Sequence, residues 1–400
     1  MTVRQIHPSI ARTPARACAA SLLSAPSGQS LFTAPRGQSV ESELVQSSHV
    51  HAGSRPRIDY LATGGTIASV RSGGAPGATP TLTAEEIAGS VPGIDDVADL
   101  RTSQFMQCAS TSITFADLLC LRYEIALRIV DGSAGVVITQ GTDTIEETAF
   151  ALDLLCSGDA PIVISGAMRD PSLPGADGPA NLLAAVRVAA STPARGLGAL
   201  VVLNDQIHAA RFVSKRHTSS PSAFHSPLTG PLGWISEGRV VIATRPVGRM
   251  HVELSPDAVM APVALVRLAL GDDGRILPEL ADLGFRGTVI EGFGGGHVTP
   301  AMMPLLKRLV TQMPVVLSSR TGSGEVLSHT YRYTGSEIEL LELGLISAGA
   351  LDGLKARLLL SMCLAADYSR QQVIDAFQTT GDMSAPIPPR ETTVAGSGRR

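Results

Sequence analysis

From residue 57 onward, short apolar runs alternate with segments whose apolar residues recur at helical spacing. Each apolar run is bounded by Gly, Pro, Asn or Asp, which is typical of a buried strand between turns. Strands that alternate with helices predict a parallel, doubly wound α/β sheet. The expected strands are 58–62, 135–139, 161–165 and 199–203, and the expected helices between them are 114–130, 144–156 and 179–190.

The pattern changes after this first unit. Residues 239–244 are expected to form a late strand, paired in a hairpin with the stretch around 233–235. Residues 246–262 lack periodicity and are rich in Pro and Arg, so they are the best linker candidate. Beyond them, strands are expected at 263–270, 287–291 and 315–318, and helices at 277–283, 300–311, 351–364 and 371–377.

The fold class expected from this order is α/β, with two domains of unequal size. A larger N-terminal domain with a doubly wound, mostly parallel sheet is predicted over 56–245, and a smaller C-terminal α/β domain over 263–380. Residues 1–55 are rich in Ser, Ala, Pro, Gly and Arg and are predicted to be a disordered extension, and 381–400 a flexible tail.

Charge and apolar runs exclude several classes of function. The net charge of −4 divides into +4 from residues 1–57 (six Arg, two Glu) and −8 from the rest of the chain. The acidic body has no stripe of basic residues, which argues against nucleic acid as the main partner. No apolar run approaches the ~20 residues that span a bilayer. No convincing signal peptide is visible, so a cytoplasmic location is expected.

The Cys and His residues do not predict a metal site. The five Cys are scattered without a CxxC pair, and the His residues show no ligand spacing. Buried, reduced thiols are the expected state of most of these cysteines.

Two strand ends carry polar motifs. The first strand leads into TGGTIAS (63–69), where paired glycines permit a sharp turn and leave amides free near a ligand. By spacing alone, this is an ordinary Gly-rich turn in which Thr66 caps a helix. The second leads into TQGTDTIEE (139–147), where Thr144 and Glu147 have capping-box spacing. Thr142 and Asp143 are then either loop and cap residues or a hydroxyl and a carboxylate placed for chemistry at a helix start.

Taken together, the two motifs resemble those of the bacterial-type L-asparaginase family, which includes the glutaminase-asparaginases. The resemblance covers about residues 57–377, and its matching stretches are 61–68, 138–149, 165–169, 176–182, Asn204-Asp205 leading to Lys215, and 230–233. It implies a hydrolase of linear amide bonds that converts L-asparagine and water to L-aspartate and ammonia, without a metal or organic cofactor.

The resemblance also implies roles for single residues. Thr66 matches the nucleophile, which forms an acyl-enzyme intermediate. Thr142, Asp143 and Lys215 match a second catalytic cluster, in which Lys215 relays a proton, Thr142 activates water and Asp143 binds the substrate ammonium. Without the resemblance, Lys215 in its basic stretch would be read as a solvated loop charge.

Substrate-binding residues follow from the same resemblance. Gly65 and Gly141 are expected beside the substrate, and Ser110 and Thr111 fall where the family holds the α-carboxylate. Glu325 is the nearest acid that could reach the substrate from a neighbouring subunit. Active sites are therefore expected between the large domain of one subunit and the small domain of its partner, in a homodimer at least and a homotetramer by family pattern.

One departure from the family concerns its mobile loop. The family usually carries a tyrosine there, but residues 71–83 contain none, and the five tyrosines lie elsewhere. Thr79 or Thr81 is a candidate substitute as proton relay, and the Gly-rich loop still suits a lid. The alternatives that stay open are a glutaminase, a hydrolase of another amide such as a tRNA-linked one, and a non-catalytic amino-acid-binding protein.

Overall fold

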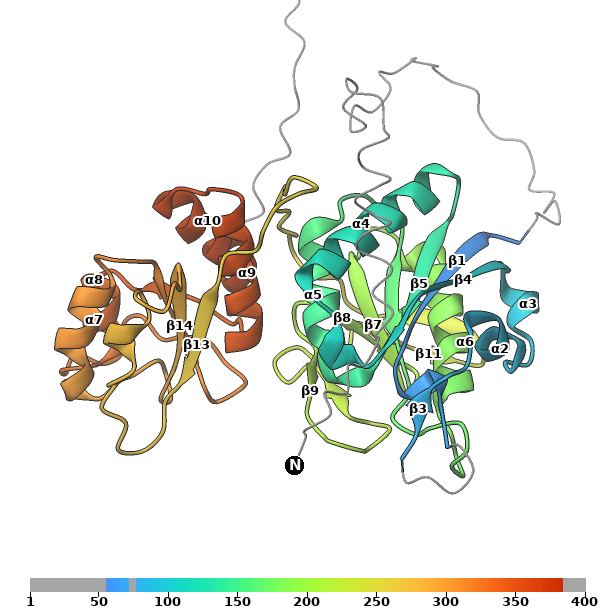
Figure 1. The fold of residues 1–400 in the computed structure, drawn as a ribbon, viewed down its shortest axis with the longest axis horizontal. Helices are drawn as coiled ribbons and strands as arrows, with labels where there is room; N and C mark the ends of the chain where they lie inside the picture. The colour runs from blue at the N-terminus through green and yellow to red at the C-terminus, as the bar shows by residue number, and fades with distance from the viewer. Residues whose placement is uncertain (1–54, 72–76, 384–400) are drawn as a thin grey trace, which may run out of the picture.

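The larger of two α/β lobes is built on one eight-stranded sheet in the computed structural model, which describes residues 55–71 and 77–383 (Figure 1). Five adjacent strands are parallel, and the last three are antiparallel. In spatial order the strands are β4 (Asp99–Cys108), β1 (Arg57–Gly64), β5 (Gly135–Thr139), β6 (Ile162–Ser165), β7 (Ala199–Leu203), β8 (Gln206–Ala209), β11 (Gly233–Ser236) and β12 (Arg239–Ile242).

Helices cover both faces of this sheet. Side chains alternate along β1, so that Tyr60 packs into one apolar cluster and Leu61 into the other. On the Tyr60 face lie α6 (Gly178–Ala189), α2 (Ala84–Gly89) and α3 (Ile94–Val97). On the Leu61 face lie α4 (Phe115–Val130) and α5 (Ile145–Leu155). The predicted fold class, a doubly wound and mostly parallel sheet followed by a smaller α/β unit, is confirmed.

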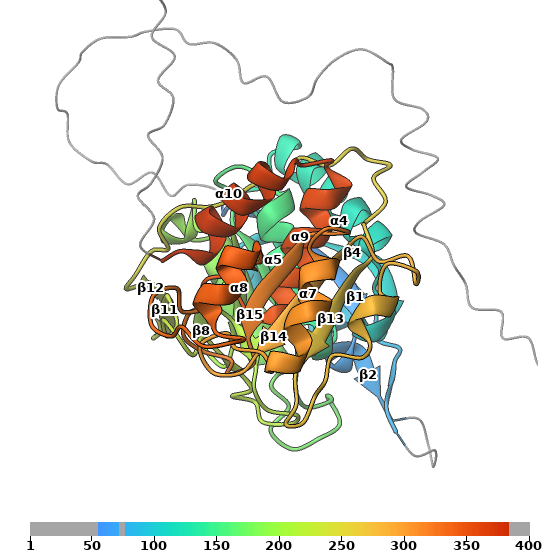
Figure 2. The ribbon, with the colours of Figure 1, turned by 90° about the vertical axis from the view of Figure 1, so that its left-hand side faces the viewer.

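The smaller lobe has a four-stranded, fully parallel sheet. Figure 2 shows α7 and α8 on its outer face, while α9 and α10 lie between the sheet and the larger lobe. The strands are β13 (Val263–Arg267), β14 (Gly287–Gly292), β15 (Val315–Ser319) and β16 (Ile346–Ser347), and the helices are α7 (Met303–Leu309), α8 (Glu337–Leu343), α9 (Gly353–Ala365) and α10 (Arg370–Gly381).

An apolar core joins the two lobes. Phe150 and Leu154 of α5 pack in one cluster with Leu359 and Met362 of α9. Residues 243–262 connect β12 to β13 without a helix or strand, and Val252 and Leu254 of this connection enter the same cluster. Because the shared surface is apolar and buried, the lobes are held as one body.

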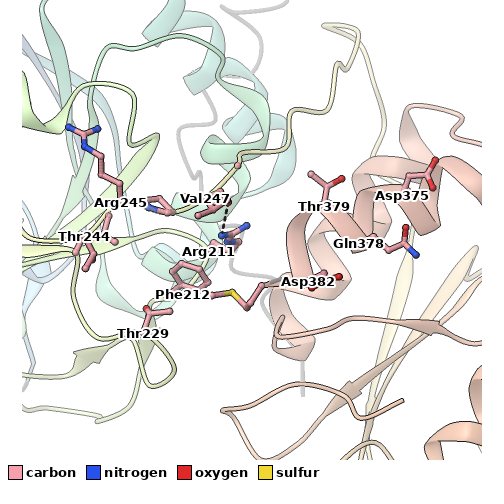
Figure 3. Close-up of a pocket in the computed structure, with 14 residues that line it drawn as sticks. Arg211, Phe212, Thr229, Thr244, Arg245, Val247, Asp375, Gln378, Thr379 and Asp382 are labelled. Carbon is pink, nitrogen blue, oxygen red and sulfur yellow. Dashed lines mark hydrogen bonds between the residues drawn. The ribbon is translucent and has the colours of Figure 1, made fainter. Parts of the chain in front are cut away.

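A cavity of about 600 Å³ opens beside this interface, between the connection and α10 (Figure 3). Arg211 bridges it, donating to the Val247 and Thr380 carbonyls at 3.3 Å each, and its guanidinium stacks over the Phe212 ring. None of the predicted site residues lines this cavity.

The structure differs from the expected secondary structure at several places. Residues 277–283 do not form an α-helix, because the segment contains Pro278 and forms only the 3₁₀ turn η5 (Leu277–Glu279) before further turns. The helix expected at 300–311 is shorter, since the 3₁₀ turn η6 (Pro300–Met302) precedes α7. The sequence does not predict strand β4, because six of its ten residues are polar and its burial is only partial.

The remaining elements are short. They are β2 (Ser69–Val70), β3 (Thr79–Pro80), β9 (Ser214–Lys215), β10 (Phe224–His225), and the 3₁₀ turns η1 (Thr66–Ala68), η2 (Ser110–Ser112), η3 (Thr142–Thr144) and η4 (Thr192–Ala194). Within the described ranges, no helix is long and apolar enough to cross a membrane. The predicted extension and most of the predicted tail lie outside the described residues, as does the middle of the predicted lid, 72–76.

Candidate active site

The candidate site is built at the carboxyl ends of β4, β1 and β5, which are adjacent and parallel. In such a sheet, ligands bind beyond these ends. Three polar turns follow the three strands directly: η2 begins at Ser110, η1 at Thr66 and η3 at Thr142. The topology therefore brings together candidates that are up to 76 residues apart in the sequence.

Backbone contact between two glycines fixes the turns after β1 and β5 against each other. A Cβ on Gly65 would lie 2.1 Å from the Gly141 nitrogen and 2.3 Å from the Gly141 Cα. Gly65 also has a φ of +81°, a conformation that L side chains rarely adopt. Only glycine fits here, and the next residues along the two turns are Thr66 and Thr142.

The turn after β4 joins the same group. A Cβ on Gly141 would lie 2.9 Å from the Ser110 Oγ, so the Ser110 side chain lies over the Gly141 backbone. The Thr144 hydroxyl donates to the Ser110 carbonyl at 3.2 Å. Ser110 is buried, whereas Thr111 is exposed.

Thr66 is half-buried at the start of η1. Its hydroxyl has no hydrogen bond to any other residue in the described part of the chain. Ser69, three residues on, donates its hydroxyl to the Gly65 carbonyl at 2.8 Å and holds the turn closed. The Thr66 hydroxyl is thus not engaged in holding the turn.

Lys215 ties the second cluster together. Its Nζ donates to Thr142 Oγ1 at 2.8 Å and to Asp143 Oδ1 at 2.6 Å. The Lys215 side chain is 15% exposed and the Asp143 side chain 65% exposed, so the pair opens to solvent on the carboxylate side. Lys215 is therefore not a solvated loop charge: it is held on β9, which pairs with β10.

The capping box expected at Thr144 and Glu147 is wrong. Thr144 is the N-cap of α5, but its side chain makes no cap hydrogen bond. Its hydroxyl instead donates to Ser110 and accepts from the Gln140 amide at 3.2 Å. The residue that looks like a cap in the sequence connects the turns after β4 and β5.

Glu325 belongs to the smaller lobe. It is exposed on the loop after β15, and no hydrogen bond or ion pair in the described residues links it to Thr66, Thr142 or Asp143. The neighbouring Gly322 carbonyl accepts a hydrogen bond from Arg216. The prediction that Glu325 serves the site of a partner subunit is not tested by a single chain.

No tyrosine hydroxyl in the described residues has a hydrogen bond to Thr66, Thr142 or Lys215. Tyr60 is fully buried, and its hydroxyl lies 2.8 Å from Thr139 Oγ1. Burial raises the pKa of Tyr60 far above its ordinary value. Tyr331 and Tyr333 are exposed on the smaller lobe, packed around His297. Thr79 lies on β3, opposite Val70, at the base of the predicted lid.

Gln140 was not singled out in the sequence as a site residue. It is fully buried between the turns, and its Oε1 has no hydrogen-bond partner in the described residues. A buried polar atom is costly without a partner, so this amide fixes the turn at some expense in stability. Its place directly before the motif glycine Gly141 is the sequence signal that points to it. Within the described ranges, no group of three or more His, Cys, Asp or Glu residues is placed to hold a metal ion.

Comparison with known proteins gives consistent matches over both lobes. Residues 57–248 match the family described as "Asparaginase, N-terminal", and residues 262–377 match "Glutaminase/Asparaginase C-terminal domain". The chain is 34% identical to an L-asparaginase of Bacillus licheniformis over 78% of this chain and 96% of the relative. It is 33% identical to L-asparaginase 2 of Escherichia coli strain K12 over 80% of this chain and 92% of the relative.

A solved structure has the same fold. The crystal structure of a probable cytoplasmic L-asparaginase from Campylobacter jejuni superposes with a TM-score of 0.75 at 33% identity, covering 81% of this chain and all of the other.

Proposed function

Because this chain belongs to the bacterial-type L-asparaginase family, we propose that it hydrolyses L-asparagine to L-aspartate and ammonia with Thr66 as nucleophile. The observation that supports the proposal is the contact of the Gly65 and Gly141 backbones, because the next residues along these two turns are Thr66 and Thr142, and Thr142 accepts a hydrogen bond from Lys215. The family also supports a small amino-acid substrate.

In the first half-reaction, the Thr66 oxygen attacks the side-chain amide carbon of asparagine. The Thr66 proton leaves through a relay, the C–N bond breaks, and ammonia departs with an added proton, which leaves an ester between Thr66 and the aspartyl group. Backbone amides of the two glycine turns are the nearby donors for the oxyanion that forms at the amide oxygen.

In the second half-reaction, water attacks the ester and releases aspartate. The Lys215 ammonium donates to the Thr142 oxygen, so the Thr142 hydroxyl proton points away from Lys215 and is free to bind water or substrate. The proposal has Asp143 accept a hydrogen bond from the substrate ammonium, which its 65% exposed side chain supports. Ser110 and Thr111 are proposed to bind the α-carboxylate.

The test is ammonia release from L-asparagine by the wild-type chain and by Thr66→Ala. We expect Thr66→Ala to lose turnover by several orders of magnitude while its circular dichroism and melting temperature stay unchanged, because the side chain carries no structural hydrogen bond in the described residues. Unchanged turnover in this variant would assign the nucleophile elsewhere.

The same assay on L-glutamine decides the nearest alternative, since the smaller lobe matches a family described as both glutaminase and asparaginase. Calorimetric binding of asparagine without ammonia release would favour a non-catalytic amino-acid-binding protein, which the absent loop tyrosine keeps open.

We further propose a homo-oligomer whose sites take a residue from a partner subunit, and a cytoplasmic location. The name of the Campylobacter jejuni relative supports the location, whereas a Haemophilus influenzae relative is named periplasmic. Fractionation of cells that express the full chain distinguishes a cytoplasmic from a periplasmic location.

A further inference from the structure

Lys355 is a buried cation at the interface between the lobes. It lies on α9 of the smaller lobe and is 1% exposed. Its Nζ donates to the Val213 carbonyl at 2.8 Å and to Asp352 Oδ2 at 2.6 Å, and Glu146 Oε2 lies 3.9 Å away. Two of these three partners, Val213 and Glu146, belong to the larger lobe.

Both partners in the larger lobe stand next to candidate catalytic residues. Val213 directly precedes β9 (Ser214–Lys215), so its carbonyl is two residues from Lys215. Glu146 is the second residue of α5, three residues after Asp143. One ammonium of the smaller lobe therefore contacts both segments that carry the Lys215–Asp143 ion pair.

The surroundings make this cation an unusual choice for stability alone. The residues that follow Lys355 on α9, among them Ala356, Leu358 and Leu359, belong to the apolar cluster between the lobes. A buried ion pair often stabilises a fold no more than well-packed apolar residues do, because both charges lose their hydration. A role in holding the Val213 and Glu146 segments in a fixed geometry explains the buried charge of Lys355 better than a role in stability does.

The charges around Lys355 form one coupled group. Burial raises the pKa of Glu146 despite the opposing charge of Lys355. Burial also disfavours ionisation of Asp352, but the charge and hydrogen bonds of Lys355, together with the charge of Arg216, outweigh it and hold the pKa of that carboxyl below its usual range. The other charged groups coupled to these two carboxyls are Glu147 and Arg216.

We infer that Lys355 is a positioning residue for the amidohydrolase reaction. By holding the Val213 carbonyl and the Glu146 carboxylate from the smaller lobe, it keeps Lys215 Nζ on Thr142 and Asp143. The inference rests on the proposed function, and it makes the smaller lobe of the same chain a support of the chemistry in the larger lobe.

The test compares Lys355→Met with Arg249→Met. Arg249 is the control, because it also forms an ion pair with a residue of α5, Asp153, near the other end of that helix. The Arg249 Nη2 lies 3.0 Å from Asp153 Oδ1, and the two side chains are 15% and 14% exposed. We expect Lys355→Met to lower kcat at least ~tenfold with a smaller change in KM, because misplacement by about 1 Å is that costly. Arg249→Met is expected to lower the melting temperature without changing kcat.

A second variant, Glu146→Gln, keeps the shape of the side chain and removes the negative charge from one of the two contacts with the larger lobe, so it should lower kcat by less than Lys355→Met. It provides the answer if Lys355→Met does not fold. Wild-type kcat in a folded Lys355→Met or Glu146→Gln protein overturns the inference.

Crystal structures of the variants separate this inference from the proposed function. If the wild type releases no ammonia, the proposed function fails, and positioning is then read from the distance between Lys215 Nζ and Asp143 Oδ1, which is 2.6 Å in the wild type. A distance that stays within hydrogen-bond range in the variants contradicts positioning, and a separated pair supports it.

Discussion

His208 illustrates how one buried side chain sets a dependence on pH. It lies on β8 and is 1% exposed, with Nδ1 2.9 Å from Ser226 Oγ and Nε2 without a partner in the described residues. Burial, helped by the nearby His225, lowers the pKa of His208 from 6.5 to about 4. The folded state therefore keeps His208 neutral where the unfolded chain already binds a proton.

The sign of the effect follows from proton binding. Between pH 6.5 and pH 4 the unfolded chain holds more protons at this residue, so the free energy of unfolding falls as the pH falls. For His208 alone we expect a loss of about 2 kcal/mol between pH 7 and pH 5. Urea unfolding of the wild type and of His208→Gln at both pH values measures it, with the exposed His329→Gln as control. Equal pH dependence in the wild type and His208→Gln would show that this histidine is not the cause.

At the scale of elements, the site depends on the packing of the turns after β1 and β5. Gly65→Ala adds a Cβ 2.1 Å from a backbone nitrogen that cannot move without displacing η3. We expect ammonia release to fall more than ~100-fold, because the groups on both turns shift.

The control for Gly65→Ala is Gly158→Ala. Gly158 also has a positive φ, +108°, but its added Cβ meets nothing within 4 Å. The control is expected to lose about 1 to 2 kcal/mol of stability from backbone strain alone and to keep its activity. If Gly65→Ala behaves like Gly158→Ala in both assays, the close packing of the two turns does not matter for activity.

The elements also show what the sequence can and cannot predict. Strands β5 and β7 have the predicted bounds, because each is a fully buried run of five residues with a continuous apolar centre. Strand β4 escaped prediction because it lies at the sheet edge, where polar and apolar residues mix. The sequence motifs predict only that Thr66 and Thr142 each follow a strand. These two strand ends are adjacent because β1 and β5 are neighbours in the sheet.

Lys355 shows the limit of a single sequence most clearly. A lone lysine in a helical pattern reads as a solvated charge. Its burial results from the docking of α9 on the larger lobe, which no local pattern encodes. Likewise, the hydrogen bonds of Thr144 depend on where β4 ends, so its spacing to Glu147 misled the prediction of a cap.

At the scale of the whole molecule, the open question is whether sites are shared between subunits. Glu325 is exposed, and no hydrogen bond or ion pair in the described residues joins it to the Lys215 cluster of the same chain. Mixed oligomers of Thr66→Ala and Glu325→Ala subunits test this. If each site combines Thr66 of one subunit with Glu325 of the other, a dimer of one Thr66→Ala subunit and one Glu325→Ala subunit has one intact site out of two.

We therefore expect each variant alone to be impaired, and activity to return when the two are unfolded and refolded together. No recovery on mixing argues for sites completed within one chain. Full activity of Glu325→Ala alone removes Glu325 from the site without deciding the oligomeric state, which light scattering measures independently.

The apolar cluster that joins the lobes has a consequence for how this protein can change over time. Phe150 and Leu154 pack in the same apolar cluster as Leu359 and Met362. Because this cluster is close-packed, a change of side-chain volume in one lobe requires a matching change in the other. The two halves of the chain can therefore not diverge independently of each other. Chimeras that exchange one half with that of a relative are expected to require repair at this seam before anywhere else.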